Sequence, residues 1–308
     1  MFKNFSPTAL GVTGHQSELI ELALTYGFSG MDLDASELVS RARLKGMDYA
    51  RRLIDSAKIK LGAFPLSVDL EADDAQFVEG VKRLGEAAAA AAEVGCRRCV
   101  ATLAPFSATR PYHENFEFHR QRLGAICEAL RPSGARLGLG FQAAEYLRRN
   151  QPFQFIHDFD ALGLLINMVG ASNIGFLVDP WDLVVSGLGL DALAKLPVEQ
   201  IVAVQLAGLP QDKPLPDLDQ NSRLVPDVGG RIDLAAVLRI LAEKHYDGPV
   251  TPRPSRGAVP SRRREAIVRQ VAEGIDRVWR AAGLPCERRV FSAAAVPAAA
   301  AAPPAEES

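Results

Sequence analysis

The sequence predicts an α/β protein built as a single (β/α)8 TIM barrel, and two observations lead to that prediction. Apolar, β-rich runs recur along the chain, and helical patterns with recognisable ends lie between them. Several runs are almost wholly apolar, as is typical of parallel strands buried on both faces. Eight such pairs in series favour a closed barrel, because every parallel strand then has two neighbours. The predicted strands are Ala9–Thr13, Gly30–Asp34, Lys60–Val68, Arg97–Leu103, Ala135–Phe141, Ile174–Asp179, Ile201–Ala207 and Pro249–Arg253.

The helices between these strands are marked by capping residues. Asp73 or Asp74 can cap one helix, and Asp233 can cap another. Asn115 is expected to begin a third, and Arg262–Ala282 forms the last. An open, doubly wound sheet is the alternative architecture, but no Gly-x-Gly-x-x-Gly motif follows the first predicted strand.

Composition divides the chain into a barrel and a tail. Residues 1–284 suit one α/β barrel, a fold that commonly takes about 250 residues. Residues 285–308 are rich in Ala and Pro and carry no apolar stripe that could be buried. We therefore predict that this low-complexity tail is disordered, and that truncation after about Val290 leaves the melting temperature unchanged.

Charge and hydropathy exclude several classes of partner. The net charge is −2, from 35 basic and 37 acidic residues, so no bulk attraction for nucleic acid or an anionic membrane is expected. No apolar run reaches the roughly 18 to 20 residues that span a bilayer, and the N-terminus has no signal-peptide pattern. Cys96 and Cys99 have zinc-knuckle spacing without a second pair, which indicates structural thiols in a reducing cytoplasm. The oligomeric state is left open.

Candidate functional residues follow the strands, because the active site of a (β/α)8 barrel lies at the C-terminal strand ends. They are mostly polar side chains that suit a small polar or sugar-like molecule, together with one tryptophan that could form an apolar wall. The ligand-binding candidates are His15, Gln142, Asp179, Trp181, Asp182, Gln205, Arg223 and Arg253.

From about Leu10 to Leu284 the chain resembles the sugar phosphate isomerase/epimerase family, whose members have the xylose isomerase-like barrel. The resemblance rests on stretches in the same order and spacing through the repeats. It implies one divalent metal (Mn, Mg, Co or Zn) held by Glu, Asp, His and Glu after strands five to eight, with both Glu side chains transferring protons. The stretches are Glu18–Asp34, Arg110–Leu123, Arg136–Phe141, Ile174–Leu183 and Arg231–Thr251.

The sequence departs from this implied metal site at most of its positions. Asp179 is retained and Arg223 matches the family, but Gly140 and Arg253 stand where the two Glu are expected, and Gln205 stands in place of His. A divalent cation needs several oxygen or imidazole ligands, and a nearby guanidinium repels it. We therefore expect no metal and no other cofactor, and no catalytic residue can be named. We expect Asp179 to form a direct or water-bridged ion pair with Arg253, or to cap the following turn.

Two hypotheses about function follow from these residues. In the first, the protein is a relative whose metal site has degenerated and which binds a small polar ligand or a protein partner at the barrel mouth. In the second, it is an active sugar isomerase or epimerase that moves a proton on a hydroxy-ketone or aldose-type substrate, without a metal or with ligands relocated around one.

Overall fold

The central sheet closes on itself. In the computed structural model, which describes residues 1–286, β1 (Phe2–Phe5) pairs in parallel with β2 (Gly30–Met31) on one side and β11 (Pro249–Pro252) on the other. The sheet order is β3-β2-β1-β11-β10-β9-β7-β5-β4. Its two ends, β3 (Lys60–Leu61) and β4 (Phe64–Pro65), are halves of one extended segment, so eight parallel strands form a ring. The remaining strands of the ring are β5 (Arg98–Thr102), β7 (Arg136–Gly140), β9 (Ile174–Val178) and β10 (Ile201–Leu206).

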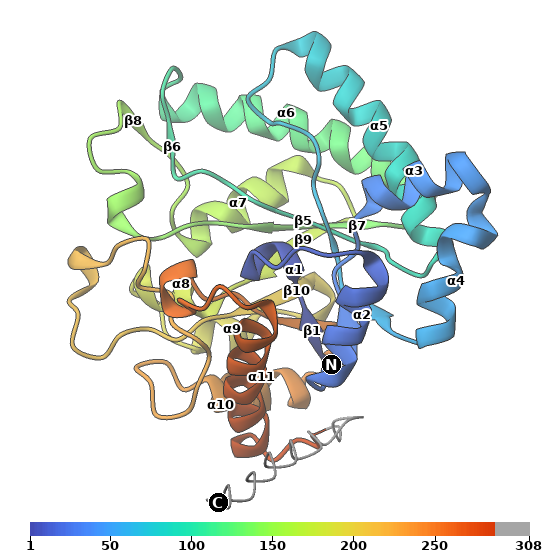
Figure 1. The fold of residues 1–308 in the computed structure, drawn as a ribbon. Coiled ribbons are helices and arrows are strands. Elements are labelled where there is room, and N and C mark those ends of the chain that lie inside the picture. Colours follow the sequence, from blue (N-terminus) through green and yellow to red (C-terminus); the bar gives the residue numbers. More distant parts are fainter. Residues whose placement is uncertain (287–308) are drawn as a thin grey trace, which may run out of the picture.

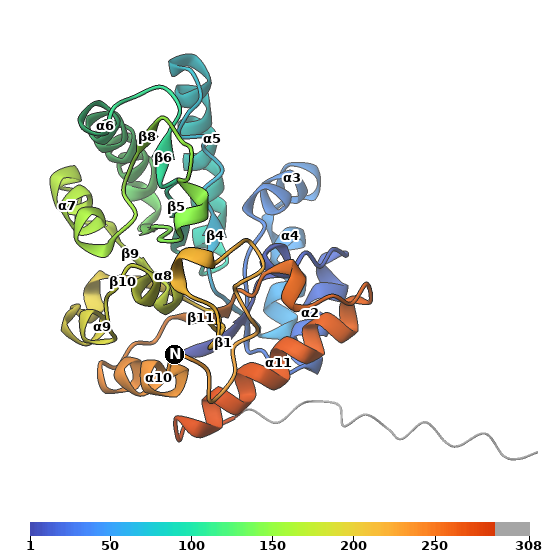
Figure 2. The ribbon, with the colours of Figure 1, turned by 90° about the vertical axis from the view of Figure 1, so that its left-hand side faces the viewer.

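Helices surround this ring on the outside, as Figures 1 and 2 show from two directions. Their alternation with the strands confirms the predicted barrel. A short antiparallel pair, β6 (Phe106–Ser107) and β8 (Phe153–Gln154), lies outside the ring. The helices are α1 (Pro7–Leu10), α2 (Gln16–Thr25), α3 (Ala35–Lys45), α4 (Met47–Ala57), α5 (Asp74–Glu93), α6 (Tyr112–Leu130), α7 (Phe159–Val169), α8 (Pro180–Val185), α9 (Asp191–Lys195), α10 (Leu234–Glu243) and α11 (Arg264–Ala281), with short 3-10 turns η1 (Arg131–Ser133), η2 (Glu145–Leu147), η3 (Val198–Gln200), η4 (Leu215–Asp217) and η5 (Arg256–Ala258).

The first strand corrects the sequence prediction. The predicted strand at residues 9–13 begins within the short helix α1, which has Pro at its first position and ends at Gly11 with a φ of 60°. The first strand of the sheet is β1. All four of its residues are buried, but Lys3 and Asn4 are polar, so the sequence shows no apolar run there. Lys3 donates to Asp276 of α11 at 2.7 Å, and both side chains are buried. Strand β1 therefore carries a buried polar side chain that contacts a helix, and no hydrophobic pattern in the sequence reveals it.

The capping predictions are confirmed at two helices. Asp73 accepts a hydrogen bond from Gln76 N at the start of α5, and Asp233 accepts one from Ala236 N at the start of α10. Asn115 does not begin its helix, because α6 starts at Tyr112 and Asn115 lies in its first turn. There the Asn115 side chain accepts from Arg110 instead.

Three further expectations concern the cysteines, membrane-spanning segments and the C-terminal tail. Cys96, Cys99 and Cys127 are buried free thiols in the core, and burial raises the pKa of Cys96 to about 12. None of the helices within residues 1–286 is both long and apolar enough to cross a membrane. The predicted disordered tail falls almost entirely outside the described residues, so that prediction stands as made.

Candidate functional site

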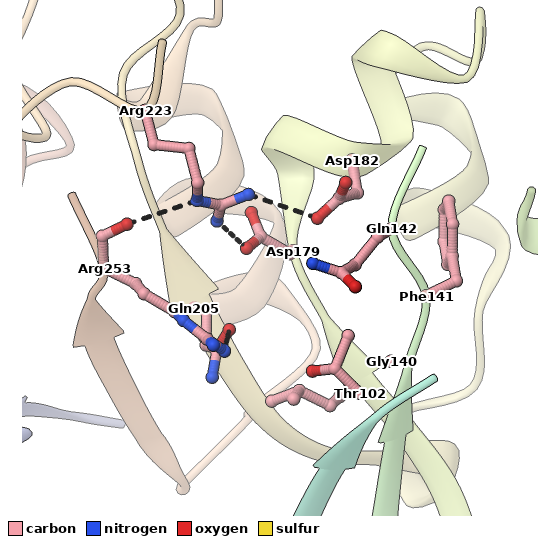
Figure 3. A pocket seen from close by; sticks show the side chains of 10 residues that line it. Thr102, Gly140, Phe141, Gln142, Asp179, Asp182, Gln205, Arg223 and Arg253 are labelled. Carbon is pink, nitrogen blue, oxygen red and sulfur yellow. Dashed lines mark hydrogen bonds and ion pairs between the residues drawn. The ribbon is translucent and has the colours of Figure 1, made fainter. Parts of the chain in front are cut away.

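A small pocket opens at the C-terminal ends of the barrel strands (Figure 3). Its volume is about 60 Å³, which is room for a few water molecules or for one small polar group. Residues from β5, β7, β9, β10 and β11 and from the loops that follow them meet there, as expected for a barrel active site. The lining residues are Thr102, Gly140, Phe141, Gln142, Leu177, Asp179, Asp182, Gln205, Arg223 and Arg253.

Two buried carboxylates come from the end of β9 and the first turn of α8. Asp179 is the N-cap of α8, and its Oδ1 accepts from Trp181 N at 3.0 Å. Asp182 Oδ1 accepts from Ala143 N at 2.8 Å, which ties the carboxylate to the loop after β7. Both side chains are less than a tenth exposed. The helix start thus holds both acids rigidly against the pocket.

Arg223, from the loop after β10, bridges these carboxylates. Its Nη2 contacts Asp179 Oδ2, and its Nη1 donates to Asp182 Oδ2 at 3.2 Å. Its Nε donates to the Arg253 carbonyl oxygen at 3.3 Å, and its guanidinium lies 4.7 Å from the Trp181 ring centroid. A planar guanidinium can satisfy two carboxylates and an aromatic face at once, which an ammonium group cannot. Figure 3 shows this guanidinium joined to both acids by dashed lines.

Arg253 does not make the direct ion pair with Asp179 that the sequence predicted. Its Nη1 donates to Gln205 Oε1 at 2.8 Å, and Arg223 is the cationic partner of Asp179. The direct form of this prediction was wrong, because Arg223 lies on a long loop whose return to the strand ends has no signal in the sequence. The water-bridged form stays a prediction. The alternative expectation, that Asp179 caps the following turn, is confirmed.

Asp182 is the acid with the most perturbed ionisation at this site. Burial raises its pKa to about 6, and the neighbouring Asp179 adds to that rise. Arg223 and the Ala143 amide oppose the shift by stabilising the carboxylate. A carboxyl group with this pKa can exchange a proton near neutral pH.

The β5–β7 side of the pocket is neutral. Gly140 stands where the implied metal site has Glu, and a Cβ there would lie 3.3 Å from the Leu177 carbonyl oxygen and 3.5 Å from Thr102 Oγ1. The space beside Gly140 is thus narrow, and the polar groups facing it are Thr102 and the Gln142 amide.

Six of the eight predicted binding residues line the pocket, and two lie elsewhere. Trp181 is buried behind Arg223 and donates from Nε1 to the Ser222 carbonyl oxygen at 3.3 Å. His15 is exposed at the start of α2, where it forms a capping box with Glu18. His15 is therefore a helix cap.

Asp32, at the end of β2, is an acid near the mouth that the sequence analysis did not single out. It accepts from Asn4 Nδ2 at 2.7 Å and from Ala63 N at 3.2 Å. Burial raises its pKa, whereas these donors and the charge of Arg253 lower it. No sequence motif marks Asp32, because its hydrogen bond with Asn4 joins residues 28 positions apart in the chain.

The donor set at the mouth does not fit a divalent metal. Two carboxylates and the amides of Gln142 and Gln205 are present, and the guanidinium of Arg223 already contacts both carboxylates. Within residues 1–286, no three His, Cys, Asp or Glu side chains are grouped as metal ligands would be. Hard cations need more oxygen ligands than this site offers.

Comparison with known proteins finds a family match over most of the barrel. A family model described as xylose isomerase-like TIM barrel matches residues 20–278. No curated protein sequence matches the chain. A xylose isomerase domain protein from Alicyclobacillus acidocaldarius superposes with a TM-score of 0.81 at 25% identity, covering 92% of this chain and 99% of that one.

Two more distant structures share the fold. IolI protein with a bound zinc atom has a TM-score of 0.71 at 17% identity, covering 92% of this chain and 98% of that chain. D-psicose 3-epimerase with D-tagatose from Clostridium cellulolyticum has a TM-score of 0.69 at 12% identity, over 92% and 99% of the two chains. At these identities the likeness concerns the fold.

Proposed function

This chain belongs to the xylose isomerase-like TIM barrel family, and from that premise we propose that its barrel mouth binds a small polar, sugar-like molecule without a divalent metal. The observation that carries the proposal is the position of Arg223. Its guanidinium holds Asp179, the one retained residue of the implied metal-ligand set, together with Asp182. An organic cation thus takes the electrostatic role of a metal ion at the strand ends.

The energetics of the mouth support a metal-free site. A divalent ion bound at Asp179 would displace Arg223 and lie near the guanidiniums of Arg223 and Arg253. Repulsion from one such group about 4 Å away is roughly 8 kcal/mol at an effective dielectric near 20. Both carboxylates are already paired with Arg223, so an incoming ion would also have to displace that guanidinium from them.

The character of the lining supports a sugar-like ligand. Amides from Gln142 and Gln205 and the hydroxyl of Thr102 offer both donors and acceptors to a polyol. The Asp and Arg side chains offer charged partners for hydroxyl groups. Structures of sugar epimerases share the fold, which makes sugars the first ligands to screen.

Elemental analysis tests the metal-free part of the proposal. The purified protein is incubated separately with Mn²⁺, Mg²⁺, Co²⁺ and Zn²⁺, desalted and analysed for bound metal. We expect metal content far below one ion per chain. One tightly bound ion per chain would overturn the proposal.

Thermal stability in EDTA tests the ligand-binding part. A ligand that binds the folded state raises the melting temperature, so neutral sugars and polyols are screened against the wild type and Gly140→Val. That substitution narrows the pocket beside Leu177 and Thr102, whereas a Cβ at Gly124 in α6 meets open space. We expect ligand-induced stabilisation in the wild type and in Gly124→Val, and its loss in Gly140→Val. Equal stabilisation of all three proteins would place the binding elsewhere.

Asp182 favours a second candidate function, a sugar isomerase or epimerase that moves a proton without a metal. Its pKa of about 6 suits an acid–base group, and its carboxyl group lines the pocket. Such an enzyme would exchange the hydrogen next to a substrate carbonyl with solvent. Proton NMR in D₂O, with a panel of ketoses and aldoses, would detect this exchange. Exchange by the wild type that Asp182→Asn abolishes would establish the enzyme, and its absence across the panel would leave the binding protein.

A further inference from the structure

We infer that the molecule bound at this mouth carries an anionic group, a carboxylate or a phosphate, and that Arg253 binds it. This inference rests on the proposed function and names the chemical class of its ligand. Its basis is a pocket-lining guanidinium with one hydrogen bond to a neutral amide and no carboxylate partner among residues 1–286.

The backbone of Arg253 is fixed at the end of β11. Its N–H donates to the Leu206 carbonyl oxygen at 2.7 Å, and its own carbonyl oxygen accepts from Arg223 Nε. From this anchor the side chain extends into the pocket beside Gln205 (Figure 3). The guanidinium is thus placed by the strand and by the Gln205 amide before any ligand arrives.

The acids of the pocket are already engaged. Each oxygen of Asp179 has a donor, Trp181 N for Oδ1 and Arg223 for Oδ2. Each oxygen of Asp182 also has one, Ala143 N for Oδ1 and Arg223 for Oδ2. Arg223 and two backbone amides therefore occupy the four carboxylate oxygens, and the guanidinium of Arg253 makes no hydrogen bond to either acid and faces the pocket.

An arginine in this position calls for an acceptor. Arginine has five N–H donors and keeps its charge at any ordinary pH. Arg253 uses one of these donors in its hydrogen bond to Gln205. Burial lowers its pKa, and so does the neighbouring Arg223, whereas the charges of Asp179, Asp182 and Asp32 raise it. The net direction is a lowering, so these carboxylates offset the burial of this cation only in part. An incoming carboxylate or phosphate would form a charge-assisted, two-pronged pair with the planar guanidinium.

The surroundings of Arg253 suit an anion held by neutral donors. The Gln205 amide turns its oxygen toward Arg253, which leaves its NH₂ group available. The hydroxyl of Thr102 and the amide of Gln142 also line the pocket. A cavity of about 60 Å³ accepts the charged head group, with the rest of the ligand extending through the open mouth.

Matched pairs of ligands test the inference. D-gluconate is compared with D-glucitol, and D-glucose 6-phosphate with D-glucose, by isothermal titration calorimetry in EDTA at constant ionic strength. Removing one side of a buried, hydrogen-bonded charge pair weakens binding by about 30-fold or more. We expect at least one anion to bind the wild type that much more tightly than its neutral partner, and the stronger pair identifies carboxylate or phosphate as the preferred group.

Three variants assign the effect to Arg253. Arg253→Gln should remove the preference for the anion. Arg253→Lys should keep part of it, because lysine retains the positive charge but lacks the planar, two-pronged guanidinium. Arg149→Gln should keep the full preference, since Arg149 is exposed and pairs with Glu145 at 3.6 Å. Inorganic phosphate alone, binding all four proteins equally, would mark adventitious ion binding and count against the inference.

The outcomes separate this inference from the proposed function. If the neutral partner binds the wild type as well as the anion does, or if Arg253→Gln keeps the preference, the anion inference is wrong while the sugar-binding proposal stands. If none of the four ligands binds and a divalent metal does, both are wrong. The wild-type comparison is independent of how well the variants fold.

Discussion

The guanidinium of Arg223 contacts the carboxylate of Asp179, 44 positions earlier in the chain, across the mouth of the barrel. The carboxylate is 8% exposed and the guanidinium side chain 19% exposed, so water screens the pair little. The same guanidinium reaches Asp182. A single arginine from a loop thereby contacts both acids at the end of β9 and connects that loop to the strand ends.

Removal of Arg223 should destabilise the protein strongly. Arg223→Ala leaves the carboxylates of Asp179 and Asp182 buried without their cation, and breaking a buried pair from one side costs about 3 to 5 kcal/mol. Urea unfolding followed by circular dichroism measures the loss. Arg149→Ala is the control, because an exposed pair is worth under about 1 kcal/mol. A loss for Arg223→Ala no larger than the control would contradict the bridging role.

A double-mutant cycle should show which arginine is coupled to Asp179. Asp179→Asn combined with Arg223→Gln is expected to give a coupling free energy of about 1 to 3 kcal/mol, as for residues in direct contact. Asp179→Asn combined with Arg253→Gln should give a clearly smaller coupling, because Arg253 donates to Gln205. A larger coupling free energy of Asp179 with Arg253 than with Arg223 would instead support the ion pair predicted from the sequence.

Asp182 should make the stability depend on pH. Its folded-state pKa of about 6 lies above the ordinary aspartate value of 3.8, so the folded state binds the proton more tightly than the unfolded state. The stabilisation is complete below about pH 4 and is lost as pH rises through about 6, a change on the order of 3 kcal/mol. Urea unfolding of the wild type and Asp182→Asn at pH 4, 5, 6 and 7 measures it. The wild type should lose stability relative to the variant across this range, and a constant difference would refute the shift.

Rebuilding the implied metal-ligand set should restore metal binding. The triple variant Gly140→Glu, Gln205→His and Arg253→Glu supplies two carboxylates and one imidazole around Asp179 and removes one guanidinium. The neighbours of Gly140 lie 3.3 to 3.5 Å from the new Cβ, so small shifts accommodate it. We expect about one Mn²⁺ per chain by calorimetry, and none for Gly140→Glu alone. A folded triple variant without Mn²⁺ affinity would show that Arg223 keeps Asp179 from a metal.

The buried pair between Lys3 and Asp276 should matter for the first strand. The two side chains are 3% and 6% exposed and join β1 to α11. Lys3→Met should cost about 3 to 5 kcal/mol, since it removes the buried cation that contacts Asp276 at 2.7 Å. Lys3→Met with Asp276→Leu should recover much of that loss. Thermal unfolding of the three proteins tests this, and a double variant less stable than Lys3→Met would argue against it.

The barrel could be predicted from the sequence alone. Seven of the eight strands were located by their apolar runs, because strands buried on both faces leave a continuous hydrophobic signal. Helix starts at Asp73 and Asp233 followed from local capping chemistry. The missing ligands at Gly140 and Gln205 could likewise be read directly, since a residue type alone says whether a metal ligand is present. These features depend on local composition, which the chain carries without reference to its fold.

Which charged side chains pair with one another depends on the tertiary structure. Strand β1 was missed because the polar side chains of Lys3 and Asn4 are buried through contacts with residues far along the chain. Arg223 took the place expected for Arg253 because a loop folds back over the strand ends, and loop paths carry no periodic signal. Ion pairs depend on distances of a few ångströms between side chains on separate elements. Such distances are set by the closed ring of strands and the loops above it.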